Sequence, residues 1–144
     1  MFKLHSVAGR LAIGMLIGLV VGVAVMLLMP NFDIPIPTMF GLGTLLMFVL
    51  MGMVTGFIGI FDRHPVFEFK MHWWISGPVA GALFMLMYVL FTYETLNFVM
   101  QSSLVTWTGL SSPFWALLDG IFIGGVMGFF ETKFAGEGPK LPVR

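Results

Sequence analysis

Four long stretches of apolar residues divide this chain of 144 residues, and any fold must either bury them or place them in lipid. They cover approximately residues 11–29, 38–61, 76–98 and 113–130. A helix of about 20 apolar residues crosses the hydrocarbon core of a bilayer. Charged residues are only 10% of the chain, against about 25% in soluble domains. We therefore expect a single all-α polytopic membrane domain over residues 1–144, with four transmembrane helices arranged as two helical hairpins.

Residues with strong helix-end preferences stand at several ends of these stretches. Thr38 can cap the second helix, and Ser112 followed by Pro113 fits the start of the fourth. Pro78 is tolerated only in the first turn of the third helix, where its missing N–H costs nothing. Residues 132–144 are predicted to form a polar, loosely ordered tail.

All seven Lys and Arg residues fall on one side of a membrane protein with four spans. They precede the first stretch, follow the fourth or lie in the 62–75 connection, whereas the 31–37 and 101–112 connections contain none. Basic residues gather on the cytoplasmic side of membranes. We therefore predict that both termini are cytoplasmic, in an integral protein of a bacterial inner (plasma) membrane. The residues are Lys3, Arg10, Arg63, Lys70, Lys133, Lys140 and Arg144.

Tryptophans stand near the ends of the apolar stretches, and their amphipathic rings are favoured at the level of the lipid headgroups. The predicted interface anchors are Trp73, Trp74, Trp107 and Trp115. The 62–75 connection alternates between apolar and polar residues in its second part, which predicts an extended segment in the membrane interface. Its acidic residues and histidines have no recognised metal-ligand spacing, so no metal site is expected.

Glycines recur at every fourth residue in all four stretches. Small residues at this spacing line one face of a helix and let another backbone approach closely. We expect them to pack the helices within one bundle; the alternative is that one glycine face forms a subunit interface. The residues are Gly14, Gly18, Gly22, Gly52, Gly56, Gly77, Gly81, Gly120, Gly124 and Gly128.

A short pattern at the end of the second stretch recurs at the end of the fourth. Residues 56–62 and 125–131 both read G-x-x-G-x-F-acid. Two hairpins of the same orientation are the simplest cause of such an echo.

Two carboxylates lie inside the apolar stretches, where a charged group is costly and indicates a functional position. Glu94 lies near the outer end of the third stretch and Asp119 near the outer start of the fourth, so the two could face each other. Each could be protonated, accept hydrogen bonds, bind a cation or pair with a basic residue of another protein. The simpler alternative is that they reach interfacial water. Asn97 and Tyr93 are neighbouring groups that would help to coordinate an ion or pair with a partner.

The sequence has no P-loop, no H-E-x-x-H and no G-x-S-x-G motif, and it contains no cysteine. We therefore expect no enzymatic activity and no cofactor. The leading hypothesis is a small integral subunit or scaffold of a larger membrane assembly, which packs through its glycine-rich helix faces. Its partners would be the lipid bilayer and other integral membrane proteins, or copies of itself, and not nucleic acid. The alternative is a homo-oligomeric channel or carrier for a proton or small cation, using Asp119 and Glu94.

Overall fold

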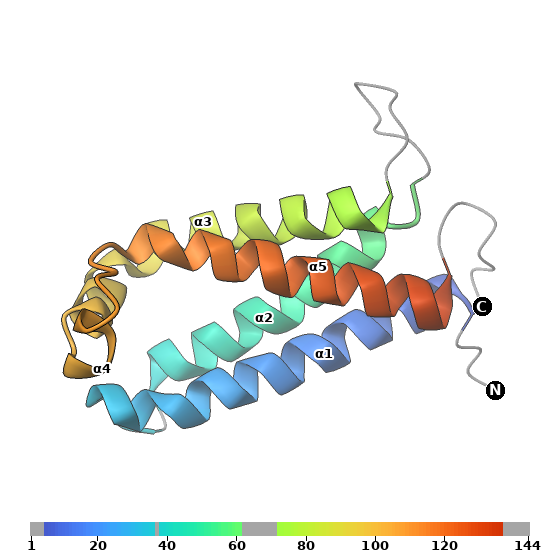
Figure 1. Ribbon diagram of the computed structural model, residues 1–144. Helices are drawn as coiled ribbons and strands as arrows, with labels where there is room; N and C mark the ends of the chain where they lie inside the picture. Colours follow the sequence, from blue (N-terminus) through green and yellow to red (C-terminus); the bar gives the residue numbers. More distant parts are fainter. Residues whose placement is uncertain (1–4, 37, 62–71, 137–144) are drawn as a thin grey trace.

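The structure is a computed structural model that describes residues 5–36, 38–61 and 72–136. Over these ranges the chain is all-helical, with no β-strand. Four long helices run along the molecule (Figure 1). They are α1 (Val7–Leu28), α2 (Met39–Ile58), α3 (Trp73–Met100) and α5 (Ala116–Ala135). Each is long and apolar enough to cross a membrane, which confirms the predicted all-α class with four candidate spans.

Three short helical segments complete the path of the chain. The 3₁₀ turn η1 (Met29–Phe32) continues α1, and η2 (Pro113–Trp115) leads into α5. The single turn α4 (Ser103–Thr106) lies between α3 and α5, at the end of the molecule away from the chain termini (Figure 1). These segments, with the 33–36 connection, form the end that the sequence analysis assigned to the outer leaflet.

The caps that start α1 and α2 are hydroxyl groups. The Ser6 hydroxyl accepts a hydrogen bond from the Gly9 amide at 3.0 Å, so α1 begins before the apolar stretch does. The Thr38 hydroxyl accepts from the Gly41 amide at 3.1 Å, as predicted. Side-chain oxygens at these positions satisfy amides that have no partner within the helix.

The fourth helix starts less regularly than expected. The Ser112 hydroxyl does accept from the Phe114 amide, at 3.4 Å, and Pro113 follows it. The first turn is nevertheless 3₁₀, and α-helical geometry begins only at Ala116. Tightened 3₁₀ turns are common at helix N-termini.

Several other predicted ends are corrected by the structure. α3 begins at Trp73, so Pro78 lies beyond the first turn and residues 73–75 are helical rather than extended. The hydrogen bond that Pro78 cannot donate would go to Trp74, an exposed residue near the end of the helix. α5 continues to Ala135, into the predicted polar tail. Residues 62–71 of the predicted interface segment and residues 137–144 of the tail lie outside the described residues.

α3 is kinked in its second half. Thr92 has non-helical backbone angles (φ −119°, ψ 21°), and its hydroxyl donates to the Tyr88 carbonyl oxygen at 2.6 Å. Threonine hydroxyls that bond back to the preceding turn bend helices. The kink lies beside the cavity described below.

Glycine faces bring the helices together in two antiparallel pairs, α1 with α2 and α3 with α5. A Cβ atom built on Gly14 would collide with the carbonyl oxygen of Gly52, and one on Gly81 with that of Gly120. All the glycines of the four-residue spacing lie in this way against backbone atoms of the paired helix. These glycine faces are therefore covered within the chain.

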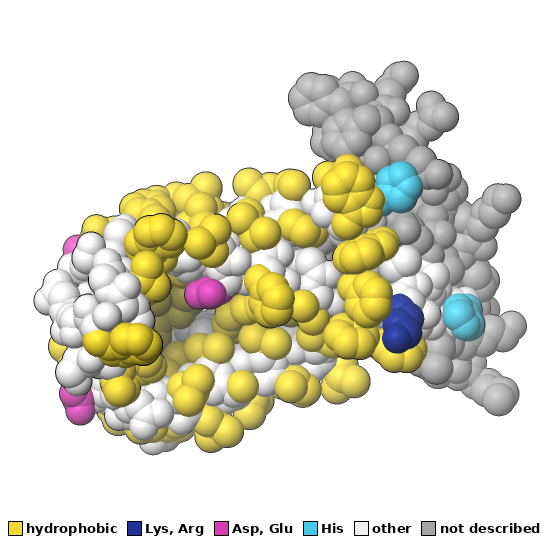
Figure 2. Space-filling model, viewed as in Figure 1, with side chains coloured by type: hydrophobic (Ala, Val, Ile, Leu, Met, Phe, Trp, Pro, Cys, Tyr) yellow, Lys and Arg dark blue, Asp and Glu magenta, His cyan; other side chains and the backbone are white. Residues whose placement is uncertain are grey.

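The core lies between the two pairs and is built of larger side chains. Its buried members are Phe48, Met51, Met85, Val89, Ala116 and Met127. Outside the pairs the surface is apolar over most of the length of the helices, whereas Lys, Arg and His side chains gather at one end and acidic side chains towards the other (Figure 2). An apolar outer surface of this length is expected of an integral membrane protein.

Candidate functional site

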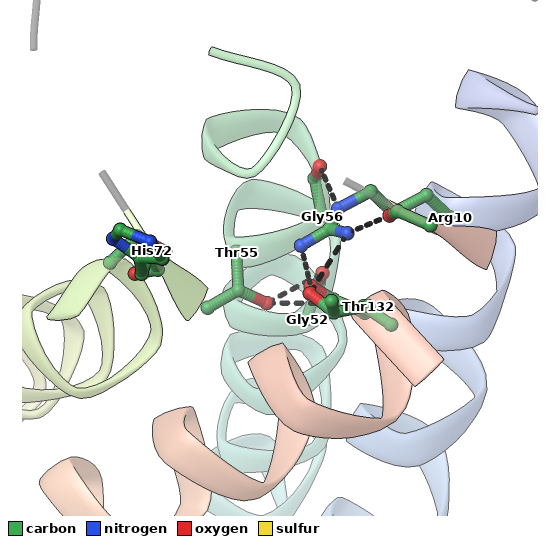
Figure 3. A network of polar contacts seen from close by, with 9 residues as sticks. Arg10, Gly52, Thr55, Gly56, His72 and Thr132 are labelled. Carbon is green, nitrogen blue, oxygen red and sulfur yellow. Dashed lines mark hydrogen bonds and ion pairs between the residues drawn. The ribbon is translucent and has the colours of Figure 1, made fainter. Parts of the chain in front are cut away.

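A buried ion pair joins the beginning of α1 to the end of α5. Arg10 and Glu131 both have side chains that are 0% exposed, and Nη2 of Arg10 lies 3.6 Å from Oε2 of Glu131. Arg10 Nε donates to the Gly56 carbonyl oxygen on α2 at 3.0 Å. Arg10 Nη1 donates to the Thr132 hydroxyl at 3.2 Å and to the Gly136 carbonyl oxygen. The guanidinium thus ties α1, α2 and the last turn of α5 together (Figure 3).

Glu131 has a second partner on α2. The Thr55 hydroxyl lies 2.8 Å from Oε1 of Glu131 and 2.9 Å from the Gly52 carbonyl oxygen, so its single proton serves one or both acceptors (Figure 3). A Cβ atom on Gly14 would overlap Glu131, and one on Gly59 would overlap Arg10. Glycines at these two positions therefore make room for the pair.

Sequence reasoning missed this cluster. It used Arg10 only as one of the basic residues that indicate the orientation, and Glu131 only as the last residue of the repeated pattern. Two signals pointed to a special environment: Arg10 directly adjoins the first apolar stretch, and Glu131 closes the repeated G-x-x-G-x-F-acid pattern. The other acid of that pattern, Asp62, lies outside the described residues.

The two helix pairs leave a half-open cavity of about 460 Å³ between them, at the end opposite to the ion pair. All four long helices contribute to its lining, together with η1 and Ile34. Most of the lining is apolar or aromatic; examples are Phe32, Phe40, Phe48, Met85, Phe122 and Ile123. Ligand pockets are about 300–1,000 Å³ and mostly apolar, with a few placed polar groups, so this cavity has the size and character of a binding site for an apolar molecule.

Three polar side chains also line the cavity: Thr44, Tyr88 and Asp119. The Thr44 hydroxyl donates to the Phe40 carbonyl oxygen at 2.8 Å and lies 2.6 Å from the Tyr88 hydroxyl. With the one proton of Thr44 donated to the Phe40 carbonyl oxygen, the hydroxyl of Tyr88 is the donor in its bond to Thr44. The lone pairs on the Tyr88 oxygen are then left to accept a hydrogen bond.

Asp119 has a different environment. It is exposed in the isolated chain and lies in the first turn of α5, where the helix dipole favours negative charge. It has no hydrogen bond or ion pair with any residue from 5–36, 38–61 or 72–136. It lines the cavity, and a rise of about 1.5 Å per residue puts it about 9 Å along the helix from Pro113.

The other predicted site residues do not join Asp119 in the lining. Glu94 is exposed on the outward face of α3, near Leu90 and Phe91. The Tyr93 ring is 6.1 Å from the ring of Phe114, and Asn97 is only partly buried. The α3 residues that do line the cavity are Met85, Tyr88, Leu96, Val99 and Met100. The two acids therefore lie in separate environments, one in a cavity and one on an apolar surface.

The predicted interface tryptophans lie near the two ends of the bundle. Trp74, Trp107 and Trp115 are exposed, while the ring of Trp73 packs 5.3 Å from the ring of Phe129. Within the described ranges there is no group of three or more His, Asp or Glu side chains that could hold a metal ion.

No family model, curated protein or solved structure matches this chain. Its function must therefore be argued from its own residues.

Proposed function

We propose that this chain is a non-enzymatic integral membrane subunit that packs against another membrane protein through the outward face of α3. In this proposal the helices form two hairpins, and both termini face the cytoplasm. The distribution of basic residues supports this orientation, because Lys and Arg concentrate on the cytoplasmic side.

The observation that carries the proposal is an acidic side chain within an apolar outward face. Phe91 is 83% exposed and Leu90 62% exposed, and Glu94 is exposed one turn further along α3. Met87 and Phe98 continue the same strip. Residues three and four apart share one face of a helix, so these five side chains form a continuous surface with one carboxylate in it.

The chemistry of this surface defines the partner. An acidic group at the centre of a membrane helix costs about 2.5–3.5 kcal/mol on insertion scales, and less nearer the interface. Glu94 has no ion pair with any of the described residues. A transmembrane helix that carries Lys or Arg at this depth would neutralise it while covering Phe91 and Leu90.

The experiment is site-specific photo-crosslinking in native membranes. A photoreactive amino acid replaces Phe91 in one variant and Leu16, which is 61% exposed on α1, in the matched control. We expect an adduct with a different membrane protein from position 91 and not from position 16. Adding Glu94→Gln should weaken that adduct several-fold. Identical adducts from both positions, or an adduct insensitive to Glu94→Gln, would contradict the proposal.

The homo-oligomeric channel remains the alternative, and one observation favours it: Asp119 lies in a cavity. Because Glu94 lies on another surface, a path that uses both acids would have to form between copies of the chain. Proton or cation flux into liposomes that contain only this protein, abolished by Asp119→Asn, would favour the channel over the subunit.

A further inference from the structure

We propose that the cavity between the two helix pairs is a binding site for a lipophilic amine, whose ammonium group is held by Asp119. This inference goes beyond the proposed function and does not depend on it. The surface proposed for the partner is the outward face of α3, whereas the cavity lies inside the bundle.

The shape and lining of the cavity select an apolar body. Its volume is about 460 Å³, within the range of about 300–1,000 Å³ typical of ligand pockets. It extends from the core residues Phe48 and Met85 to Phe32 and Ile34 at the outer end. The two helix pairs do not pack against each other where the cavity lies. An alkyl chain or a flat ring system could fill this space and contact both pairs.

The polar side chains of the cavity favour a ligand whose polar group donates hydrogen bonds, because each of them offers hydrogen-bond acceptors. A carboxylate accepts hydrogen bonds and donates none. The Tyr88 proton is used in its 2.6 Å bond to Thr44, and the Thr44 proton in its 2.8 Å bond to Phe40. The cavity therefore offers the carboxylate of Asp119 and the lone pairs of Tyr88 to a group that donates. An ammonium group supplies three donors and a compensating positive charge.

Other amphiphiles fit the charge and the depth of Asp119 less well. A fatty acid would bring a second carboxylate to Asp119, and like charges repel. A phospholipid with an ethanolamine head carries the required ammonium but also a phosphate, which must stay at the membrane surface. The ammonium group of a single-chain or compact amine can reach the depth of Asp119 and balance its charge.

The test compares three probes with the same twelve-carbon chain: dodecylamine, dodecanol and dodecanoate. The whole protein is placed in phosphatidylcholine nanodiscs, and binding is followed by thermal stabilisation and by native mass spectrometry. We expect dodecylamine to bind at least about tenfold more tightly than dodecanoate, with dodecanol between them. Asp119→Asn keeps the side-chain shape and should remove this preference while leaving dodecanol within about twofold.

Two further variants separate recognition in the cavity from partition into the bilayer. Asp33→Asn removes another carboxylate at the same end of the bundle, one that does not line the cavity, and should leave the preference for dodecylamine unchanged. Tyr88→Phe removes the second acceptor and should weaken dodecylamine about threefold. Repeating the titration with phosphatidylethanolamine in the nanodisc should leave the binding of dodecylamine unchanged, because the phosphate keeps this headgroup at the membrane surface. Competition by this lipid would overturn the assignment of the site to a single-chain or compact amine.

Equal binding of dodecylamine and dodecanoate overturns the proposal, because the cavity would then bind the alkyl chain without distinguishing the polar group at its end. An amine preference that survives Asp119→Asn, or that disappears equally in Asp33→Asn, overturns it as well.

Discussion

Arg10 near the start of α1 and Glu131 near the end of α5 form a fully buried ion pair, with 3.6 Å between Nη2 and Oε2. The two helices come from opposite ends of the sequence. The Thr55 hydroxyl and the Gly56 carbonyl oxygen, both on α2, complete the cluster. This end of the bundle is therefore fixed by directed polar contacts, while the half-open cavity lies at the other end.

The first prediction concerns this pair. Arg10→Met or Glu131→Gln should each destabilise the protein by about 3–5 kcal/mol, because each change breaks a buried ion pair by removing one of its members. The double variant Arg10→Met/Glu131→Leu should recover much of this loss, because no charge is left buried. Unfolding in mixed detergent micelles measures all three. Single variants as stable as the wild type would show that the pair contributes nothing to the fold.

The positions of the four helices were predictable because hydropathy alone sets them. A helix in lipid needs about 20 apolar residues, and the four stretches supply them. Thr38 was correctly identified as a cap because hydroxyl residues at that position have few other structural uses. The ion pair was not predictable, because its partners are distant in sequence and each stands at the end of an apolar stretch, where a charged side chain usually reaches solvent.

The cavity and the separation of the two acids were harder to foresee. The glycine face of α3 includes Gly81, and at about 100° per residue Glu94 lies about 220° around the helix from it. This spacing already indicates an outward orientation for Glu94. The cavity instead is lined by side chains of all four long helices. Its lining does not follow from periodicity, because periodicity within one helix does not tell which residues of different helices meet.

The second prediction uses the close contact between α3 and α5. A Cβ atom on Gly81 would overlap the Gly120 carbonyl oxygen and lie 2.9 Å from the Cα atom of Gly124. Gly81→Ala should therefore cost about 1–3 kcal/mol or more, since the helices must move apart. Gly43→Ala is the matched control, because a Cβ atom there meets nothing within 4 Å, and it should be neutral or stabilising by up to about 1 kcal/mol. Detergent unfolding compares them, and equal effects would refute the role of backbone contact.

The third prediction concerns the hydroxyl pair in the cavity. Thr44→Val should cost about 1–3 kcal/mol, because the Tyr88 hydroxyl loses its acceptor in an apolar lining. Tyr88→Phe should cost less, about 0.5–1.5 kcal/mol, because Thr44 keeps its bond to the Phe40 carbonyl oxygen. The order of the two free energies of unfolding is the critical result. If Tyr88→Phe were the more damaging change, the assignment of Tyr88 as the donor would be wrong.

The fourth prediction tests the proposed orientation, and the chain is well suited to it because it contains no cysteine. Single cysteines at Thr108, between α4 and η2, and at Lys133, in the last turn of α5, place one thiol at each end of the bundle. With cytoplasmic termini, a membrane-impermeant maleimide should label Thr108→Cys in intact cells and Lys133→Cys only after permeabilisation. His5→Cys, just before α1, should behave like Lys133→Cys, because an even number of crossings returns the chain to its starting side.

The reverse labelling pattern would invert the topology and place Asp119 and Glu94 in the inner leaflet. Labelling of His5→Cys and Lys133→Cys from opposite sides would instead rule out four crossings.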